Sequence, residues 1–112
     1  MATVLVGSHD DGISSGIKRN LRKHDVTIVS NLRDMLGNIN TQNYDYYIMD
    51  VNLDFHSQFT IEPAKTVAKI VGKSHLLGIA GNNDLAIEAI NSGINTIVKY
   101  YNFTSNIKAF VR

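Results

Sequence analysis

The sequence of 112 residues contains no cysteine, and its single proline is Pro63. Without cysteine, the chain can form no disulfide and offers neither a thiolate metal site nor a cysteine nucleophile. The proline follows a polar stretch, at a position where the first turn of a helix tolerates it. Pro63 therefore marks the start of a helix and does not interrupt one.

The sequence also lacks an excess of charge of one sign and a long hydrophobic run. Lysine and arginine number 11 and aspartate and glutamate 10, which gives a net charge of +1. This balance leaves no electrostatic footprint for nucleic acid or an anionic membrane. No apolar run approaches the roughly 20 residues that span a bilayer, and the short run at residues 1–6 has no basic region before it, unlike a signal peptide. We therefore expect a cytoplasmic protein whose partners are other proteins, not nucleic acid or membranes.

The composition that remains is that of an ordinary globular protein, with 44% hydrophobic and 19% charged residues. The length suits a single domain over residues 1–112. Short apolar runs alternate with stretches whose apolar residues recur at helical spacing, as Ile13, Ile17 and Leu21 do. The predicted strands are Thr3–Gly7, Asp25–Val29, Tyr46–Asp50, Leu76–Ala80 and Ile94–Val98.

Five predicted helices follow these strands, and their alternation predicts βαβ units with helices on both faces of a parallel sheet. The second helix spans Asn31–Ile39, and the last spans Ser105–Arg112 with Thr104 or Ser105 at its start. Asn82 or Asn83 caps the fourth helix, which ends at Gly93. The apolar residues expected on the third and fourth helices are Val67, Ile70, Val71, Leu85, Ile87, Ala89 and Ile90. The fold class is therefore a flavodoxin-like (βα)5 three-layer sandwich with a five-stranded sheet of order 2-1-3-4-5.

Ligands of such sheets bind beyond the carboxyl ends of the strands, where the strand order reverses. In the order 2-1-3-4-5, this point lies between the first and third strands. Asp10 follows the first strand, Asp50 ends the third and Lys99 follows the fifth. A carboxylate nucleophile, a second acid and a lysine suit phosphoryl transfer, in which Mg²⁺ bound to carboxylates and carbonyls would neutralise the phosphoryl group.

Three segments resemble the receiver domains of response regulators in two-component signalling. Residues 2–6 resemble the family's first strand, residues 46–53 its phosphoacceptor segment, and residues 86–99 its fourth helix and its fifth strand leading to a lysine. The resemblance covers nearly the whole chain. It implies a signalling module that is not an enzyme, works in a phosphorelay, and has a histidine kinase or another signalling protein as its partner.

The resemblance also implies roles for individual residues. Asp50 would be the phosphoacceptor and Lys99 would contact the phosphoryl group. Mg²⁺ would be bound weakly by Asp10, by Asp50 and by the backbone carbonyl of Asn52, with His9 as a further candidate ligand.

The sequence departs from the family pattern where receivers bind metal and report phosphorylation. Ser8 and His9 stand where the family places two adjacent acids. Ala80 replaces the hydroxyl residue that ends the fourth strand, Thr96 replaces the aromatic residue three before the lysine, and Tyr100 replaces the proline after it. These departures imply a divergent receiver or, as an alternative, a pseudo-receiver that acts only as a protein interaction module.

Other interpretations of the same residues stay open. Asp10 and Asp11 also suit the first turn of a helix, where the dipole favours acids. His9, Asp10 and Asp50 would form a zinc site if they converged. A flavodoxin-like cofactor binder is a third function, which the absence of a glycine-rich phosphate loop argues against. We expect His24, His56 and His75 on the surface and most of the five tyrosines in packing contacts.

Overall fold

The computed structural model describes residues 1–55, 58–99 and 101–112. The expectations for His56 and for Tyr100 concern residues that lie outside these ranges, as does Ser57. In the described ranges, no helix is both long enough and apolar enough to cross a membrane.

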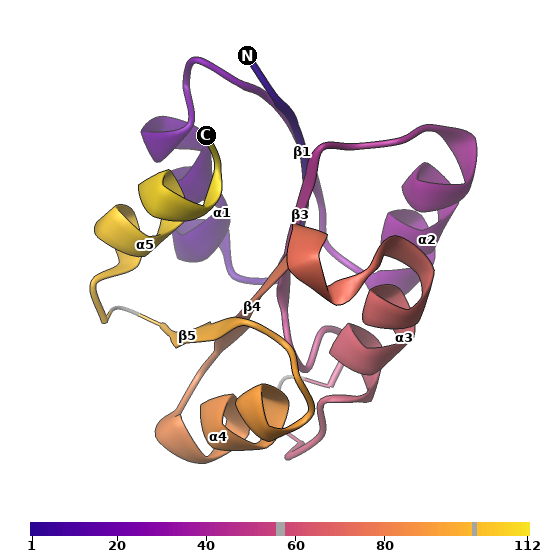
Figure 1. Ribbon diagram of the computed structural model, residues 1–112, viewed down its shortest axis with the longest axis vertical. Helices are drawn as coiled ribbons and strands as arrows, with labels where there is room; N and C mark the ends of the chain where they lie inside the picture. The colour runs from indigo at the N-terminus through magenta and orange to yellow at the C-terminus, as the bar shows by residue number, and fades with distance from the viewer. Residues whose placement is uncertain (56–57, 100) are drawn as a thin grey trace.

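The five strands form one parallel sheet in the order β2-β1-β3-β4-β5 (Figure 1). The register pairs Val6 with Ile48 across β1 and β3, and Asp50 with Ile79 across β3 and β4. The prediction of a flavodoxin-like α/β fold with this strand order is confirmed. The strands are β1 Thr3–Gly7, β2 Asp25–Val29, β3 Tyr46–Asp50, β4 Leu76–Ala80 and β5 Thr96–Val98.

Helices cover both faces of the sheet, which therefore has two hydrophobic cores (Figure 1). Side chains alternate between the faces along each strand. In β3, Ile48 packs in one core with residues of α1 and α5, and Met49 packs in the other with residues of α2, α3 and α4. The helices are α1 Asp11–Asn20, α2 Leu32–Thr41, α3 Glu62–Val71, the short 3-10 helix η1 Lys73–His75, α4 Asn83–Asn91 and α5 Phe103–Phe110.

Polar side chains fix where three of the helices begin. Asp10, Asn31 and Asn82 are the N-caps of α1, α2 and α4, and each accepts a hydrogen bond from the backbone N–H three residues later. Such a cap satisfies one of the backbone donors that a helix leaves unpaired at its start. Of the two caps predicted for α4, Asn82 is therefore the correct one. Gly93 follows this helix with a φ of +85°, the left-handed conformation that glycine adopts most readily.

The last strand and the last helix differ from the predicted bounds. β5 begins at Thr96, two residues later than expected, because the N–H of Ile94 bonds to the carbonyl of Ala89 and belongs to the turn after α4. The last helix begins at Phe103 and ends at Phe110, so the predicted start at Thr104 or Ser105 is one or two residues late. Asn102, in the left-handed conformation, turns the chain into this helix.

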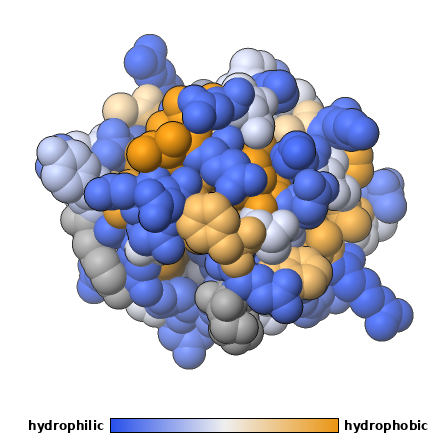
Figure 2. Space-filling view, turned by 90° about the horizontal axis from the view of Figure 1, so that it is seen from below, coloured by the Kyte–Doolittle hydropathy of each residue, from blue (hydrophilic) through white to orange (hydrophobic). Residues whose placement is uncertain are grey.

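Three isoleucines predicted to face the core are more than half exposed: Ile70 at 54%, Ile87 at 56% and Ile90 at 53%. The buried positions of α4 are Leu85, Ala86 and Ala89. Because two of these residues are alanines, α4 lies close to the sheet and its buried stripe is narrow. The exposed isoleucines flank that stripe. Figure 2, which views the molecule from below Figure 1 and so from the end where α4 lies, shows hydrophobic side chains among hydrophilic ones on this surface. Ile70 likewise lies beside the buried face of α3 formed by Ala64, Val67 and Ala68.

The surface expectations for two histidines had different outcomes. His75 is exposed, as predicted. His24 is half-buried and its Nδ1 accepts a hydrogen bond of 2.9 Å from the backbone N–H of Ala2, so the prediction for His24 was wrong. Tyr44, Tyr46 and Tyr47 pack as expected, whereas Tyr101 is 72% exposed.

Candidate functional site

The residues predicted to form the site meet in one cavity at the carboxyl ends of the strands. The cavity has a volume of about 150 Å³. Asp50 reaches it from the end of β3, His9 and Asp10 from the loop after β1, and Lys99 from the turn after β5. The residues that line it are His9, Asp10, Ile13, Asp50, Asn52, Ile79, Gly81 and Lys99.

The two oxygens of the Asp50 carboxylate differ in their surroundings. Oδ2 accepts hydrogen bonds from the Ser8 hydroxyl, at 2.9 Å, and from the His9 backbone N–H, at 3.2 Å. The His9 Nδ1 lies 3.1 Å from the same oxygen. Oδ1 is buried and has no hydrogen-bond partner in the described part of the chain. Asp50 therefore has one oxygen that the protein holds by hydrogen bonds and one that is buried without a hydrogen bond.

Burial dominates the protonation of this carboxyl. Asp50 is only 3% exposed, and the loss of solvation raises its pKa above the ordinary value of 3.8. The Ser8 hydrogen bond and the nearby His9 act in the opposite direction and offset part of the effect.

Asp10 and Lys99 form an ion pair at the rim of the cavity. The Lys99 ammonium donates to Asp10 Oδ2, and Asp10 Oδ1 accepts from the Ile13 backbone N–H at 3.0 Å. Both contacts favour the charged form, with the lysine contributing more, and they lower the pKa of Asp10. Asp10 is thus both the cap of a helix and a residue of the site, because one of its oxygens caps α1 while the other faces the site.

These contacts determine how well the site suits a metal ion. Among the described residues, no three His, Asp or Glu side chains come together in a way that could hold one. The zinc alternative is therefore wrong, because Asp10 turns to Lys99 and Ile13 while His9 turns to Asp50.

The fit to Mg²⁺ is also poor. Asp50 Oδ1 is a suitable hard oxygen, but its immediate neighbours Ser8 and His9 are not acids. The backbone carbonyl of Asn52, the other expected ligand, already accepts a hydrogen bond of 2.7 Å from the Phe55 N–H. Mg²⁺ prefers several charged oxygens or waters in octahedral geometry, and this donor set supplies few of them.

The two positions expected to act as a switch are buried and contact their own surroundings. Ala80 is fully buried in the core that includes residues of α2, α3 and α4. The residues on either side of Ala80 in the sequence, Ile79 and Gly81, line the cavity instead. The Thr96 hydroxyl donates to the Ile94 carbonyl at 2.9 Å. Ala80 has no hydroxyl and Thr96 has no ring, as the sequence shows.

Three features of the site were not predicted from the sequence. Ser8 donates to Asp50, Lys99 pairs with Asp10, and Ile79 and Gly81 form the wall on the β4 side. The alternation of side chains along β4 is a signal that could have identified Ile79, because Ala80 and Ile79 must face opposite sides.

The solved structures that match this chain include receiver domains of response regulators. The receiver domain of the Francisella response regulator 1452 matches with a TM-score of 0.77 and 22% identity, covering 98% of this chain and 93% of that one. The chemotaxis response regulator CheY4 of Vibrio cholerae matches with a TM-score of 0.76 and 19% identity, covering 99% of each chain.

A third match is a response regulator protein from Burkholderia pseudomallei with a phosphorylated aspartic acid, calcium ion and citrate. Its TM-score is 0.72 and its identity 17%, and the match covers 98% of this chain and 66% of that one. No protein-family model and no curated protein matches the sequence. The fold of this chain is therefore that of response-regulator receiver domains.

Proposed function

We propose that this chain is a receiver domain of phosphorelay signalling in which Asp50 accepts a phosphoryl group. The observation that carries the proposal is Asp50 itself, which lines the cavity at the strand ends and whose buried Oδ1 has no hydrogen-bond partner among the described residues. Lys99 lines the same cavity and can contact a phosphoryl oxygen as a point charge. The fold and the phosphorylated aspartic acid of the Burkholderia relative support this assignment.

In the proposed reaction, Asp50 is the nucleophile. Its Oδ1 forms a bond to phosphorus while the bond from phosphorus to the donor's leaving atom breaks, and the leaving group takes the bonding electron pair. The product is an acyl phosphate on Asp50. Ser8 and His9 hold Oδ2 during the attack, so the carboxylate keeps its orientation. The donor would be a phosphohistidine of a histidine kinase, and the protein would be a cytoplasmic signalling module, not an enzyme.

The proposal is tested by intact mass after incubation with acetyl phosphate and Mg²⁺. We expect one phosphoryl group on the wild type and none on Asp50→Asn. Asp25→Asn, an exposed acid at the start of β2, is the matched control and should be modified like the wild type. Modification of Asp50→Asn would place the acceptor elsewhere, and an unmodified wild type would refute the reaction.

A second candidate function is that of a pseudo-receiver, a domain that binds partners whether or not Asp50 is phosphorylated. Ala80 and Thr96 favour this function, because a phosphoryl group on Asp50 would find no hydroxyl at the end of β4 to draw inward and no ring in β5 to move. The region from 83 to 112 would then be a constant docking surface, and it carries the exposed Ile87, Ile90 and Tyr101. A phosphoryl group on Asp50 would shift an equilibrium between two conformations of the domain only if it interacted more favourably with one of them.

Hydrogen exchange with and without beryllofluoride, a phosphoryl mimic, separates the two functions. A pseudo-receiver should show protection changes confined to the cavity around Asp50. Large changes in α4 and β5, with the mimic demonstrably bound, would contradict this second function and indicate an ordinary switch.

A further inference from the structure

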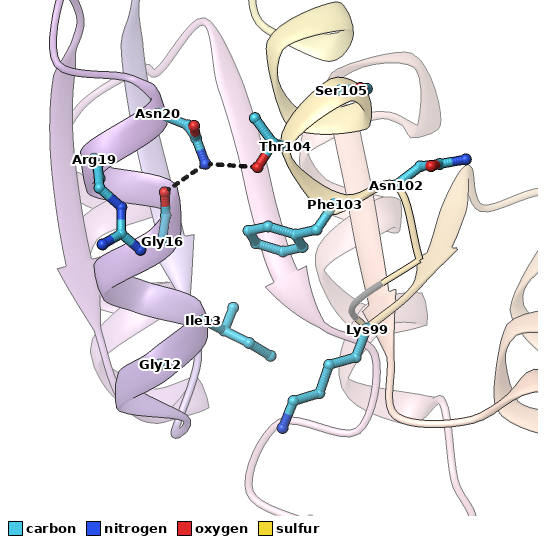
Figure 3. Close-up of a pocket in the computed structure, with 10 residues that line it drawn as sticks. All are labelled: Gly12, Ile13, Gly16, Arg19, Asn20, Lys99, Asn102, Phe103, Thr104 and Ser105. Carbon is cyan, nitrogen blue, oxygen red and sulfur yellow. Dashed lines mark hydrogen bonds between the residues drawn. The ribbon is translucent and has the colours of Figure 1, made fainter.

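A second and larger cavity lies between α1 and α5 and shares Ile13 and Lys99 with the Asp50 cavity. Its volume is about 470 Å³, within the range of roughly 300–1,000 Å³ that small-molecule sites occupy. Figure 3 shows the Phe103 ring pointing from α5 toward α1, with Ile13 and Lys99 at one end. At the other end, the Asn20 amide donates to the Gly16 carbonyl, at 2.9 Å, and to the Thr104 hydroxyl, at 3.4 Å.

Gly16 lets the Phe103 ring lie close to the backbone of α1. A Cβ atom at Gly16 would lie 3.3 Å from the Phe103 Cε2, a tight contact, and 4.0 Å from the Arg19 Nη2. The edge of an aromatic ring and a guanidinium therefore lie together beside this buried part of the helix. Glycine inside a helix costs about 1 kcal/mol relative to alanine, so α1 gives up stability at the position that admits the ring.

The charges around the cavity have one sign. Arg19 and Lys99 line it, and no carboxylate does so in the part of the chain that the structure describes. Arg19 forms no ion pair with any described residue, whereas Lys99 contacts Asp10 at the edge. The hydroxyls of Thr104 and Ser105 add polar groups that can donate to an anion.

We propose that this cavity binds a small organic phosphate monoester with a planar ring. The ring would lie against Phe103 and Ile13, and the phosphate would lie with Arg19, whose planar guanidinium can donate two parallel hydrogen bonds to it. A monoester carries a charge of about −1.5 to −2 at pH 7, which suits the Arg19 guanidinium, while Lys99 at the edge is paired with Asp10. The site is a different cavity from that of Asp50, although Ile13 and Lys99 line both.

Phenyl phosphate is the probe, titrated into ¹⁵N-labelled protein and followed by NMR. We expect saturable shifts of the Gly16, Arg19 and Phe103 amides. Inorganic phosphate, which lacks the ring, and phenol, which lacks the charge, should each bind more weakly by about fivefold or more. Shifts confined to other residues, or equal affinity for inorganic phosphate, would overturn the proposal.

Variants with matched controls locate the site. Arg19→Gln should weaken binding of phenyl phosphate by about fivefold, the upper range for an exposed charge pair. Arg33→Gln, the same change on an exposed residue of α2, should not. Gly16→Ala adds a Cβ that presses on the Phe103 ring at 3.3 Å and should weaken binding by displacing it, while Gly37→Ala should not, because a Cβ at Gly37 meets no atom within 4 Å.

Repeating the titration with Asp50→Asn separates this site from the proposed phosphorylation. Binding of phenyl phosphate that persists in this variant supports a second site, whether or not Asp50 accepts a phosphoryl group. Binding that disappears with Asp50→Asn would place the probe in the Asp50 cavity and overturn the proposal.

Discussion

Replacing Asp50 with asparagine should make the protein more stable at neutral pH. The carboxylate is buried, and its Oδ1 has no partner in the described part of the chain. Burial of a charged group that is incompletely hydrogen-bonded costs more than burial of a neutral one, here by about 1–3 kcal/mol. The asparagine amide is uncharged and removes this charge, and its oxygen can still accept the hydrogen bonds from Ser8 and the His9 N–H, although its NH2 group takes the unpartnered place of Oδ1. Loss of the attraction to the partly exposed His9 side chain offsets part of the gain, by about 1 kcal/mol at most.

The net gain of about 1–2 kcal/mol can be converted into a melting temperature. An unfolding entropy of about 2.1 cal/mol/K per residue gives about 0.24 kcal/mol/K for a chain of 112 residues. Asp50→Asn should therefore melt about 4–8 °C above the wild type at pH 7, as measured by circular dichroism or calorimetry. Asp25→Asn, the exposed control, should melt within about 2 °C of the wild type, as most surface substitutions do.

The pH dependence of this difference is the sharper test. Burial raises the pKa of Asp50 above 3.8, so the folded state binds the proton more tightly than the unfolded state. The carboxyl group thus supports the fold below pH 3.8, and this contribution is lost as the pH rises through the folded-state pKa. The advantage of Asp50→Asn should be smallest below pH 3.8 and grow with pH until it levels off. A variant less stable than the wild type at pH 7, or a difference that does not change with pH, would refute the reasoning.

Three further predictions concern the metal, the Asp10 cap and two glycines. Mg²⁺ titration by NMR should show weak binding that improves in Ser8→Asp/His9→Asp; a double variant that binds no better would contradict the placement of these residues beside the metal. Asp10→Ala should lower the free energy of unfolding in urea by about 1 kcal/mol, because the cap of α1 is lost. The pKa of Asp10 is lowered in the folded state, so its contribution to stability is present above pH 3.8 and is lost as the pH falls through the folded-state pKa. Gly37→Ala should stabilise by about 0.5–1 kcal/mol, whereas Gly78→Ala should destabilise by about 1–3 kcal/mol because its Cβ would meet side-chain atoms at 2.6 and 3.0 Å; equal effects of the two changes would refute the packing argument.

The strands and most helix starts could be predicted because they depend on local sequence. Four of the five strands have the predicted bounds, since each is a short apolar run between polar turns. Asn31 and Asn82 cap helices because their side chains reach the backbone N–H three residues later, which is a local contact. The exposure of Ile87 and Ile90 could not be predicted in this way. It depends on how closely α4 approaches the sheet, and that distance follows from the packing of Ala86 and Ala89.

The site was predictable as a set of residues but not as a set of contacts. The topology brings strand ends together, so the shared cavity of Asp50, Asp10 and Lys99 follows from the strand order. The strand order does not determine which atom each of these side chains contacts. Lys99 and Asp10 are 89 positions apart, and either of two carboxylates could have met the ammonium. The N-terminus of α1 decides between them, because its first turn fixes Asp10 at the rim where Lys99 arrives.

The replacement of acids by Ser8 and His9 changes how the charge of Asp50 is balanced. Two further carboxylates beside Asp50 would repel it, and a bound cation would be needed to offset three negative charges. Here a hydroxyl and a backbone N–H donate to Oδ2, and an imidazole lies within 3.1 Å. These groups stabilise the carboxylate without a metal, but they also withdraw charge from it and make it a weaker nucleophile. Slow phosphorylation of Asp50 and weak dependence on Mg²⁺ should therefore occur together, because both follow from the same two residues.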